Sequence, residues 1–160
     1  MVVGNTVTQA KKDKVKDINT NTNEAASALV DKVKHAPPKS YKNSTFQGHH
    51  IPVDNQDDIV PALHALYADP RIARATHNIY AYRLSSGGNT MEHFEDDGEW
   101  GAGRVLLKLL KENNITNRLV CVSRWYGGIH LGKARFDHIE AAATDALGEI
   151  LTNPTEVTQL

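Results

Sequence analysis

A short apolar run at positions 119–122, Leu-Val-Cys-Val, constrains the fold more than any other feature of the sequence. The run is too short for a helix and rich in β-branched side chains, which predicts a strand with both faces buried. The chain then changes abruptly to Arg124, Trp125 and Tyr126, followed by glycines up to Gly132. We name residues 124–132 the aromatic corner. Large side chains with polar tips beside glycine turns are typical of a surface on a rigid scaffold, although aromatic residues that close one end of a core give the same pattern.

The periodicity of apolar residues around this strand predicts further strands and helices. Their order along the chain is strand, helix, two strands, helix, strand, helix, and this order predicts an α/β (α+β) two-layer sandwich with helices mainly on one side of the sheet. The additional strands are expected at residues 45–53, 76–84 and 90–94, and the helices at 57–67, from 103 to about 113, and 133–151.

The sequence predicts one folded domain, at residues 41–152. Residues 1–40 are mostly polar and are expected to form a flexible tail, because they cannot bury enough apolar surface to order themselves. Apolar side chains recur every four positions within residues 24–34, which allows a short helix that ends before Pro37 and Pro38. The polar residues 153–160 are expected to form a second tail.

Composition excludes several functional classes. A chain of 160 residues has room for one domain, and its net charge of -1 provides no strong field for nucleic-acid binding. Cys121 is the only cysteine, which excludes an internal disulfide and fits a reducing compartment. The sequence contains neither an apolar run long enough for a membrane span nor the pattern of a secretion signal, so we expect a cytoplasmic protein without membrane contact.

Four carboxylates and three glycines lie at residues 95–103, directly before a predicted helix, and we name this segment the acidic loop. Its Asp96, Asp97 and Glu99 could hold a metal or act as an acid and a base, because adjacent carboxylates shift one another's proton affinities. Carboxylates before a helix also favour the positive end of the helix dipole and accept hydrogen bonds from its free N–H groups. Pairing with Arg124 would bring the acidic loop and the aromatic corner together. We favour the dipole and the ion pair over catalysis.

Other chemical patterns in the sequence are weaker. The glycine-rich loop before Lys133 has the spacing of a phosphate-binding loop, but Ala134 stands where magnesium binding needs Ser or Thr. The eight histidines form no HExxH pattern and no His/Cys pair with zinc spacing, so we expect no metal and no other cofactor. Tyr80 and Tyr82 could stack on bases from one strand face, but we favour cross-strand packing because no basic stripe accompanies them.

Several motifs stand out at residues 44–46 leading to 52–53, residues 75–83, residues 95–99 with 103–104, and residues 123–128 with 131–132 and 135–136. In their order and spacing, between about residues 45 and 147, these motifs resemble the IMPACT family of translational regulators. Residues 135–139, Arg-Phe-Asp-His-Ile, are similar to the eukaryotic branch, since the bacterial relatives have a small, glycine-rich stretch there.

The resemblance implies a fold similar to the second domain of ribosomal protein S5 and a function without catalysis. Eukaryotic members bind the ribosome-associated activator of the starvation-responsive kinase that phosphorylates translation initiation factor 2, and so restrain that kinase; actin is a second implied partner. These relatives usually carry an N-terminal RWD domain that grips the activator, whereas the mostly polar residues 1–40 stand in its place here. The relatives also have small residues where this chain has Trp100, whose ring could fill a groove that they leave open.

Our leading hypothesis is a monomeric regulatory binding protein whose interaction surface forms where the acidic loop and the aromatic corner meet. One alternative is an RNA- or ribosome-binding protein that uses the sheet face, and another is a small nucleotide- or metal-dependent enzyme that uses the carboxylates and Lys133. The candidate partner-binding residues are Asp96, Asp97, Glu99, Arg124, Trp125, Tyr126, Lys133 and Arg135.

Overall fold

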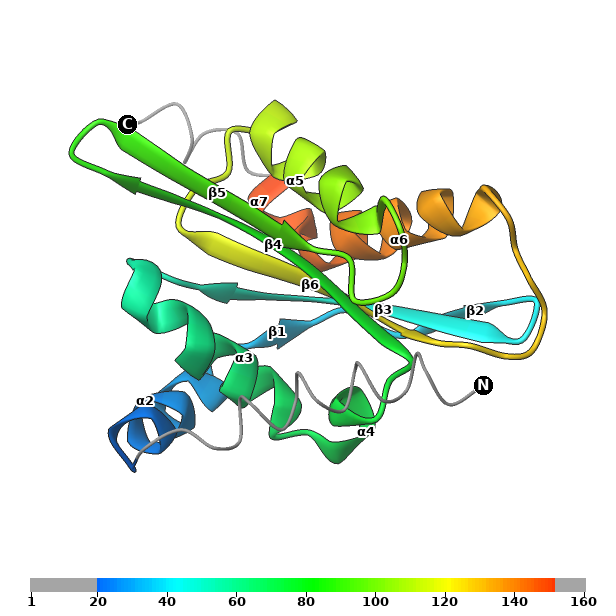
Figure 1. The fold of residues 1–160 in the computed structure, drawn as a ribbon, viewed down its shortest axis with the longest axis horizontal. Helices are drawn as coiled ribbons and strands as arrows, with labels where there is room; N and C mark the ends of the chain where they lie inside the picture. Colours follow the sequence, from blue (N-terminus) through cyan, green and yellow to red (C-terminus); the bar gives the residue numbers. More distant parts are fainter. Residues whose placement is uncertain (1–19, 152–160) are drawn as a thin grey trace.

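The computed structural model describes residues 20–151, with side chains from residue 24 onward, and these residues form one sheet between two groups of helices (Figure 1). The first half of the chain contains α2 (Thr20–Val30), β1 (Lys34–His35), β2 (Lys39–Tyr41), β3 (Ser44–Pro52), the 3₁₀ helix η1 (Gln56–Asp58), α3 (Ile59–Tyr67) and α4 (Pro70–Ala73). The second half contains β4 (His77–Ser86), β5 (Asn89–Glu95), α5 (Ala102–Glu112), β6 (Arg118–Trp125), α6 (Ala134–Ala146) and α7 (Gly148–Leu151).

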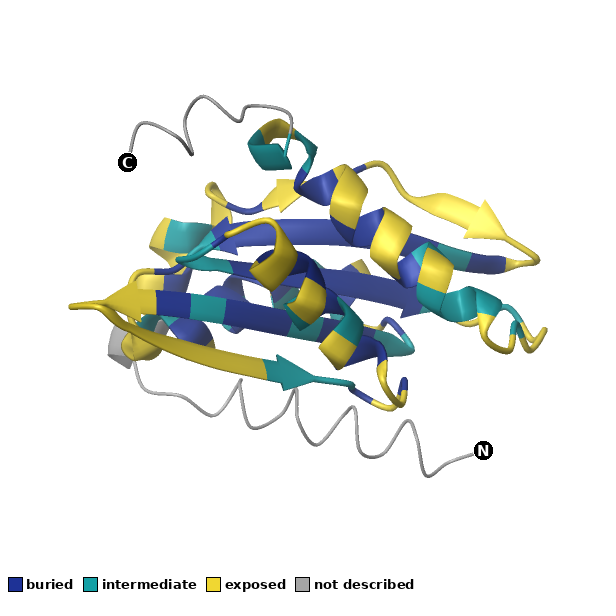
Figure 2. Cartoon of the chain, turned by 90° about the horizontal axis from the view of Figure 1, so that it is seen from above, coloured by how far each residue is buried: buried dark blue, intermediate teal, exposed yellow. Residues whose placement is uncertain are grey.

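The sheet is antiparallel throughout. Its strand order is β1-β3-β6-β4-β5, and β2 also pairs with β3, so the two short strands share one edge. Figure 1 shows α5, α6 and α7 on one side of the sheet and α2, α3 and α4 on the other. Figure 2 shows that the central strands are buried while β2 and most of β5, which form the outer parts of the sheet, are exposed.

The strand predicted from the apolar run at 119–122 is the centre of the core. Val120 and Val122 on β6 belong to the cluster under α5 and α6, and Leu119 and Cys121 belong to the cluster under α3. All four side chains are completely buried, which confirms the expectation of a strand covered on both faces. Full burial of each aliphatic side chain contributes roughly 1.5–3 kcal/mol.

The predicted α+β class is confirmed, and helices cover both faces of the sheet. Leu63 and Leu66 on α3 pack against the second face, and Leu29 on α2 packs against the same cluster. This third, partial layer adds to the two-layer arrangement expected from the sequence. Its physical reason lies in β6, because a strand that is apolar on both sides needs cover on both sides.

The sheet begins before residue 41, where the sequence placed the start of the domain. Strands β1 and β2 pair with β3, and Val33 and Ala36 beside β1 are buried. The helix expected within residues 24–34 is present as α2, although it begins at Thr20 and ends at Val30. The rest of the predicted N-terminal tail, residues 1–19, and the predicted C-terminal tail from residue 152 lie outside the described residues.

Two glycines allow chain segments to approach closely. A Cβ atom at Gly48 on β3 would lie 2.0 Å from the carbonyl oxygen of Ala142, so α6 can rest directly on this strand. A Cβ atom at Gly127 would lie 1.9 Å from the carbonyl oxygen of Asn43, so the aromatic corner can lie against the start of β3. Side chains at either position would separate these segments.

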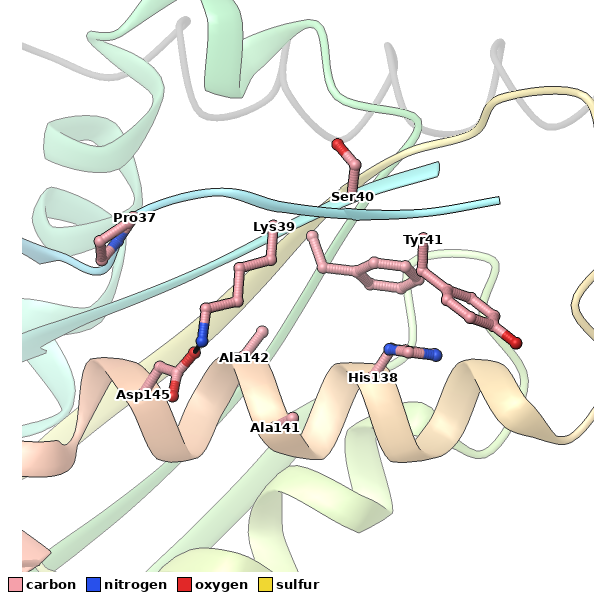
Figure 3. A pocket seen from close by; sticks show the side chains of 9 residues that line it. Pro37, Lys39, Ser40, Tyr41, His138, Ala141, Ala142 and Asp145 are labelled. Atoms are coloured by element: carbon pink, nitrogen blue, oxygen red, sulfur yellow. Dashed lines mark ion pairs between the residues drawn. The ribbon is translucent and has the colours of Figure 1, made fainter. Parts of the chain in front are cut away.

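A small hollow of ≈ 260 Å³ lies between β2 and α6 (Figure 3). Tyr41 stacks on His138 with ring centroids 4.1 Å apart, and Lys39 Nζ pairs with Asp145 at 2.8 Å. These two contacts hold β2 against α6. In the described part of the chain, no helix combines the length and the apolar character needed to cross a bilayer.

Candidate partner-binding site

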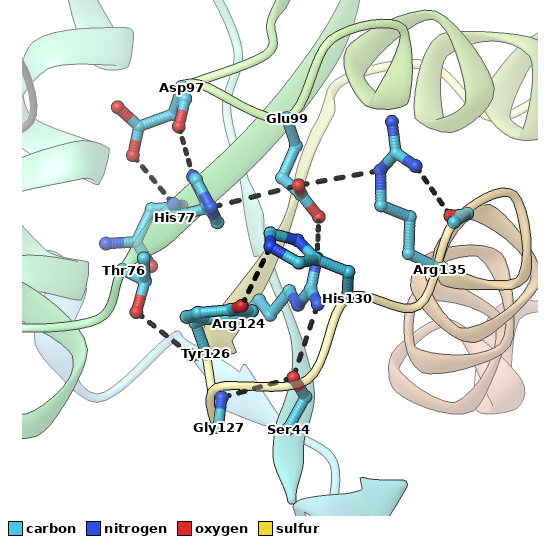
Figure 4. Close-up of polar contacts among 12 residues, drawn as sticks. Ser44, Thr76, His77, Asp97, Glu99, Arg124, Tyr126, Gly127, His130 and Arg135 are labelled. Carbon is cyan, nitrogen blue, oxygen red and sulfur yellow. Dashed lines mark hydrogen bonds and ion pairs between the residues drawn. The ribbon is translucent and has the colours of Figure 1, made fainter. Parts of the chain in front are cut away.

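The acidic loop and the aromatic corner meet through a buried ion pair, which confirms the pairing considered from the sequence (Figure 4). Arg124 Nη1 donates to Glu99 Oε2 at 2.7 Å, and the two side chains are only 4% and 7% exposed. A charge-assisted hydrogen bond of this length is among the stronger polar contacts in a protein. The pair therefore fixes the position of one loop relative to the other.

Glu99 also lies near two further cationic or ionisable groups. Its Oε1 is 3.7 Å from Arg135 Nε on α6 and 3.8 Å from His77 Nε2 at the start of β4. Burial of a carboxylate is costly unless charged partners and hydrogen bonds compensate it. Glu99 thus links the acidic loop to β4, β6 and α6.

The Arg124 guanidinium is enclosed by a hydroxyl and two rings. Its Nη2 donates to Ser44 Oγ at 3.3 Å, and its central carbon lies 5.3 Å from the Phe46 ring and 5.6 Å from the Tyr126 ring. Its Nε is buried and has no hydrogen-bond partner among the described residues. A buried N–H group without a partner costs free energy, and cation–π attraction to the two rings offsets part of that cost. Arg124 thus stabilises the aromatic corner through its buried side chain.

Asp96 and Asp97 support the acidic loop itself. Asp96 accepts hydrogen bonds from the backbone N–H of Gly103 at 2.8 Å and of Gly101 at 3.1 Å, which satisfies free donors at the start of α5. Asp97 Oδ2 accepts from the backbone N–H of Asn78 at 2.7 Å. The expectation that a carboxylate satisfies N–H groups before the helix is confirmed for Asp96. The carboxylates thus have separate partners, and within residues 24–151 no group of three His, Cys, Asp or Glu side chains is arranged to hold a metal.

His77 is held in one orientation by the acidic loop. Its Nδ1 lies 2.8 Å from the carbonyl oxygen of Asp97, and a carbonyl oxygen can only accept, so Nδ1 carries the proton. Its Nε2 then faces Glu99. The register of the sheet places His77 directly opposite Arg124. Sequence reasoning did not select His77, because only the pairing of β4 with β6 brings it to the site.

A surface hollow of ≈ 430 Å³ lies over the ion pair, and we name it the rim hollow. Trp100 lies at the edge of the hollow with 83% of its surface exposed. Its ring therefore does not fill a groove, as the family resemblance had suggested it could. Tyr126 is also exposed; its hydroxyl lies 3.5 Å from His130 Nε2, and its backbone N–H donates to Thr76 Oγ1 at 3.0 Å. The lining residues are Thr76, His77, Gly98, Glu99, Trp100, Arg124, Tyr126, His130, Leu131, Gly132 and Arg135.

Four of the eight predicted residues do not line the rim hollow: Asp96, Asp97, Trp125 and Lys133. Trp125 alternates with Arg124 along β6 and therefore faces the other side of the sheet, where its Nε1 donates to the carbonyl oxygen of Arg71 at 3.2 Å. The Arg71 guanidinium lies 4.6 Å from the Trp125 ring centroid. Lys133 is exposed at the start of α6. Of the eight predicted residues, Glu99, Arg124, Tyr126 and Arg135 come together around the hollow, and Asp96 and Asp97 support the loop that carries Glu99.

The two tyrosine side chains of β4 pack against neighbouring side chains. Tyr80 is half-buried, and its ring centroid lies 6.2 Å from that of His93. Tyr82 is buried, its hydroxyl bonds to Gln56, and its ring lies 5.5 Å from that of His93, the residue opposite it on β5. Cross-strand packing, the interpretation favoured from the sequence, is confirmed. Tyr82 is not available to stack on a nucleic-acid base.

Comparison with known proteins decides the family. The Impact N-terminal domain family matches residues 42–147. The chain belongs to this family. Protein IMPACT of Homo sapiens is 42% identical over 135 residues, which cover 83% of this chain and 42% of that protein. The IMPACT homolog of Schizosaccharomyces pombe is 41% identical over 115 residues, which cover 71% of this chain and 41% of that protein.

The chain spans about two fifths of the length of these relatives. Among solved structures, the two-domain translational regulator Yih1 is similar with a TM-score of 0.53 and 31% identity, covering 74% of this chain and 46% of that one. A structure described as a hypothetical protein has a TM-score of 0.56 and 22% identity, which supports the fold alone. The family inferred from the sequence is confirmed.

Proposed function

We propose that this IMPACT-family chain is a non-catalytic binding protein that regulates translation. It acts on the starvation-responsive kinase of translation initiation factor 2 through the ribosome-associated activator of that kinase. Membership of the family and similarity to a translational regulator support the proposal. The single observation that carries the docking site is the buried Glu99–Arg124 pair, which holds two surface loops together.

The rim hollow has the properties of a docking surface. A buried pair at its floor fixes the acidic loop and the aromatic corner before a partner arrives, so little conformational freedom is lost on binding. Trp100 and Tyr126 expose aromatic rings beside Arg135, and these residue types dominate the energetics of protein interfaces. The same hollow is the proposed binding site for the activator.

Affinity capture tests this proposal. The full chain is immobilised and incubated with ribosome fractions from starved cells, and bound activator is measured by quantitative blotting. The double substitution Trp100→Ala with Tyr126→Ala is expected to abolish recovery, because both rings leave the rim. Met91→Ala, which removes an exposed side chain on β5, is the matched control and should retain recovery.

Two results would contradict the proposal. Absence of the activator from the wild-type capture would exclude the regulatory role, and equal recovery by the double variant would exclude the rim hollow as its site. Actin, the second partner implied by the family, can be measured in the same eluates.

A further inference from the structure

The charges around the rim hollow leave one guanidinium with spare donors. Glu99 and the buried Arg124 neutralise each other at 2.7 Å, whereas Arg135 Nε lies 3.7 Å from the same carboxylate. The Arg135 side chain is 27% exposed, and its Nη1 donates a hydrogen bond to the Gly132 carbonyl oxygen. An arginine carries five N–H donors, so several remain for a ligand.

Arg135 is also held in a defined orientation. Its guanidinium carbon lies 4.4 Å from the centroid of the neighbouring Phe136 ring. A stacked guanidinium loses less freedom when it pairs with a ligand, and its planar fork matches the two oxygens of a carboxylate. The residue is therefore suited to receive a carboxylate from outside the protein.

Apolar surface gathers beside this cation. Seven large hydrophobic side chains are exposed in the described part of the chain, and two of them, Trp100 and Tyr126, line the rim hollow together with Arg135. Clustered exposed apolar side chains mark interaction sites more often than isolated ones do. A ligand for this rim should therefore combine an acidic group with an apolar group.

We propose that the rim hollow binds an acidic side chain of a protein partner through Arg135, while an adjacent apolar residue of that partner packs on Trp100. This inference rests on the proposed function, since it assumes that the ligand is a protein. It names the chemistry of the partner's contact segment: an Asp or Glu next to an aliphatic or aromatic residue.

A carboxylate fits this hollow better than a phosphate. The Glu99 carboxylate lies beneath Arg135 and repels any anion that approaches it, and a phosphate monoester carries nearly twice the charge of a carboxylate. Nucleic-acid backbones need a series of cationic contacts, whereas the permanently charged cations among the lining residues are Arg124, already paired, and Arg135. Acidic peptide segments are therefore the expected occupant.

Peptide selection tests the inference. A phage-displayed library of random dodecapeptides is selected on the full chain, and the strongest binder is synthesised together with a version whose Asp and Glu residues are Asn and Gln. Fluorescence anisotropy then gives a Kd for each peptide with wild-type protein, Arg135→Gln, Trp100→Ala and the control Met91→Ala. The side chains exchanged in these three variants are at least partly exposed, so the variants should fold.

The expected binder contains an acidic residue next to an apolar one. Its Kd should rise about tenfold or more with Trp100→Ala and with Arg135→Gln, and remain unchanged with Met91→Ala. The amide peptide should bind wild-type protein as weakly as the acidic peptide binds Arg135→Gln. Its Kd should rise little further in Arg135→Gln, because the two changes remove the same contact.

Several outcomes overturn the inference: no enriched peptide, binders without acidic residues, or equal Kd values for wild type and Arg135→Gln. Tighter binding of a 12-nucleotide single-stranded RNA that is lost in the same variants would assign the hollow to RNA instead. If the activator is still captured from ribosome fractions after such a result, the regulatory function stands and only the partner chemistry is wrong. If peptides bind as expected and the activator is not captured, the partner chemistry stands and the proposed regulatory function is wrong.

Discussion

Removal of one member of the Glu99–Arg124 pair should destabilise the fold strongly. The substitution Arg124→Met leaves a carboxylate that is 7% exposed without its contact at 2.7 Å. Among the described residues, Arg135 and His77, at 3.7 and 3.8 Å, remain as its ion-pair partners. Loss of one partner of a buried pair costs about 3–5 kcal/mol. We expect about 3 kcal/mol for Arg124→Met, because the two remaining neighbours offset part of the loss.

The reciprocal substitution should cost more. Within the described part of the chain, Glu99→Leu leaves the Arg124 guanidinium with one hydrogen bond, 3.3 Å to Ser44 Oγ, and with two aromatic rings. We expect about 4–5 kcal/mol for this variant. The double variant should be more stable than the sum of the two losses predicts, since neither buried charge of the pair remains.

Urea denaturation followed by circular dichroism measures these free energies of unfolding. The control is an ion pair of almost the same length on the surface: Lys39 and Asp145 are 2.8 Å apart, with side chains 70% and 35% exposed. Lys39→Ala should cost less than about 1 kcal/mol. Losses below about 1 kcal/mol for both Arg124→Met and Glu99→Leu, or strict additivity in the double variant, would refute the view that burial makes this pair the clamp between the two loops.

Three further substitutions or conditions test other parts of the structure. Gly48→Ala should destabilise the protein by about 3 kcal/mol or more in the same urea assay, because the added Cβ would lie 2.0 Å from the Ala142 carbonyl oxygen. The control Gly148→Ala adds a Cβ in open space and should change stability by less than about 0.5 kcal/mol. Burial, with a smaller contribution from neighbouring positive charge, lowers the pKa of His49 to about 3 from 6.5, so its contribution to stability is complete above pH 6.5 and is lost as the pH falls toward 3. Unfolding free energies should therefore fall by about 2 kcal/mol between pH 8 and pH 5 through this group alone, and a His49→Gln variant with an unchanged pH dependence would contradict that assignment. Asp96→Ala should cost about 1–2 kcal/mol by thermal and urea unfolding, because two N–H groups at α5 lose their acceptor, and a stability equal to wild type would show that water replaces it fully.

The longer elements of the fold were predictable because their apolar periodicity is local. Strand β6 and helix α5 each carry a pattern that alone indicates what the segment forms and which side is buried. Strands β1 and β2 carry no such pattern, since they have two and three residues with exposed side chains and are strands only because β3 offers them an edge. A polar composition therefore concealed ordered structure.

The candidate site was predictable in part for the same reason. Opposite charges in two loops suggested that a carboxylate of the acidic loop pairs with Arg124, but the sequence could not say which carboxylate pairs or which aromatic residue accompanies it. Along a strand, neighbouring side chains face opposite sides of the sheet, so Trp125 does not join Arg124 at the hollow. Tyr126, the first residue after β6, does. His77 enters through the pairing of β4 with β6, a long-range register that periodicity does not reveal.

Hydrogen–deuterium exchange on the complex between the full chain and the purified kinase activator would locate the docking surface. Binding at the rim hollow predicts slower exchange in residues 97–102 and 125–132, with unchanged exchange in β5 and α2. Protection confined to β5, α2 or the edge formed by β1 and β2, with the acidic loop and the aromatic corner unaffected, would contradict binding of the activator at the rim hollow.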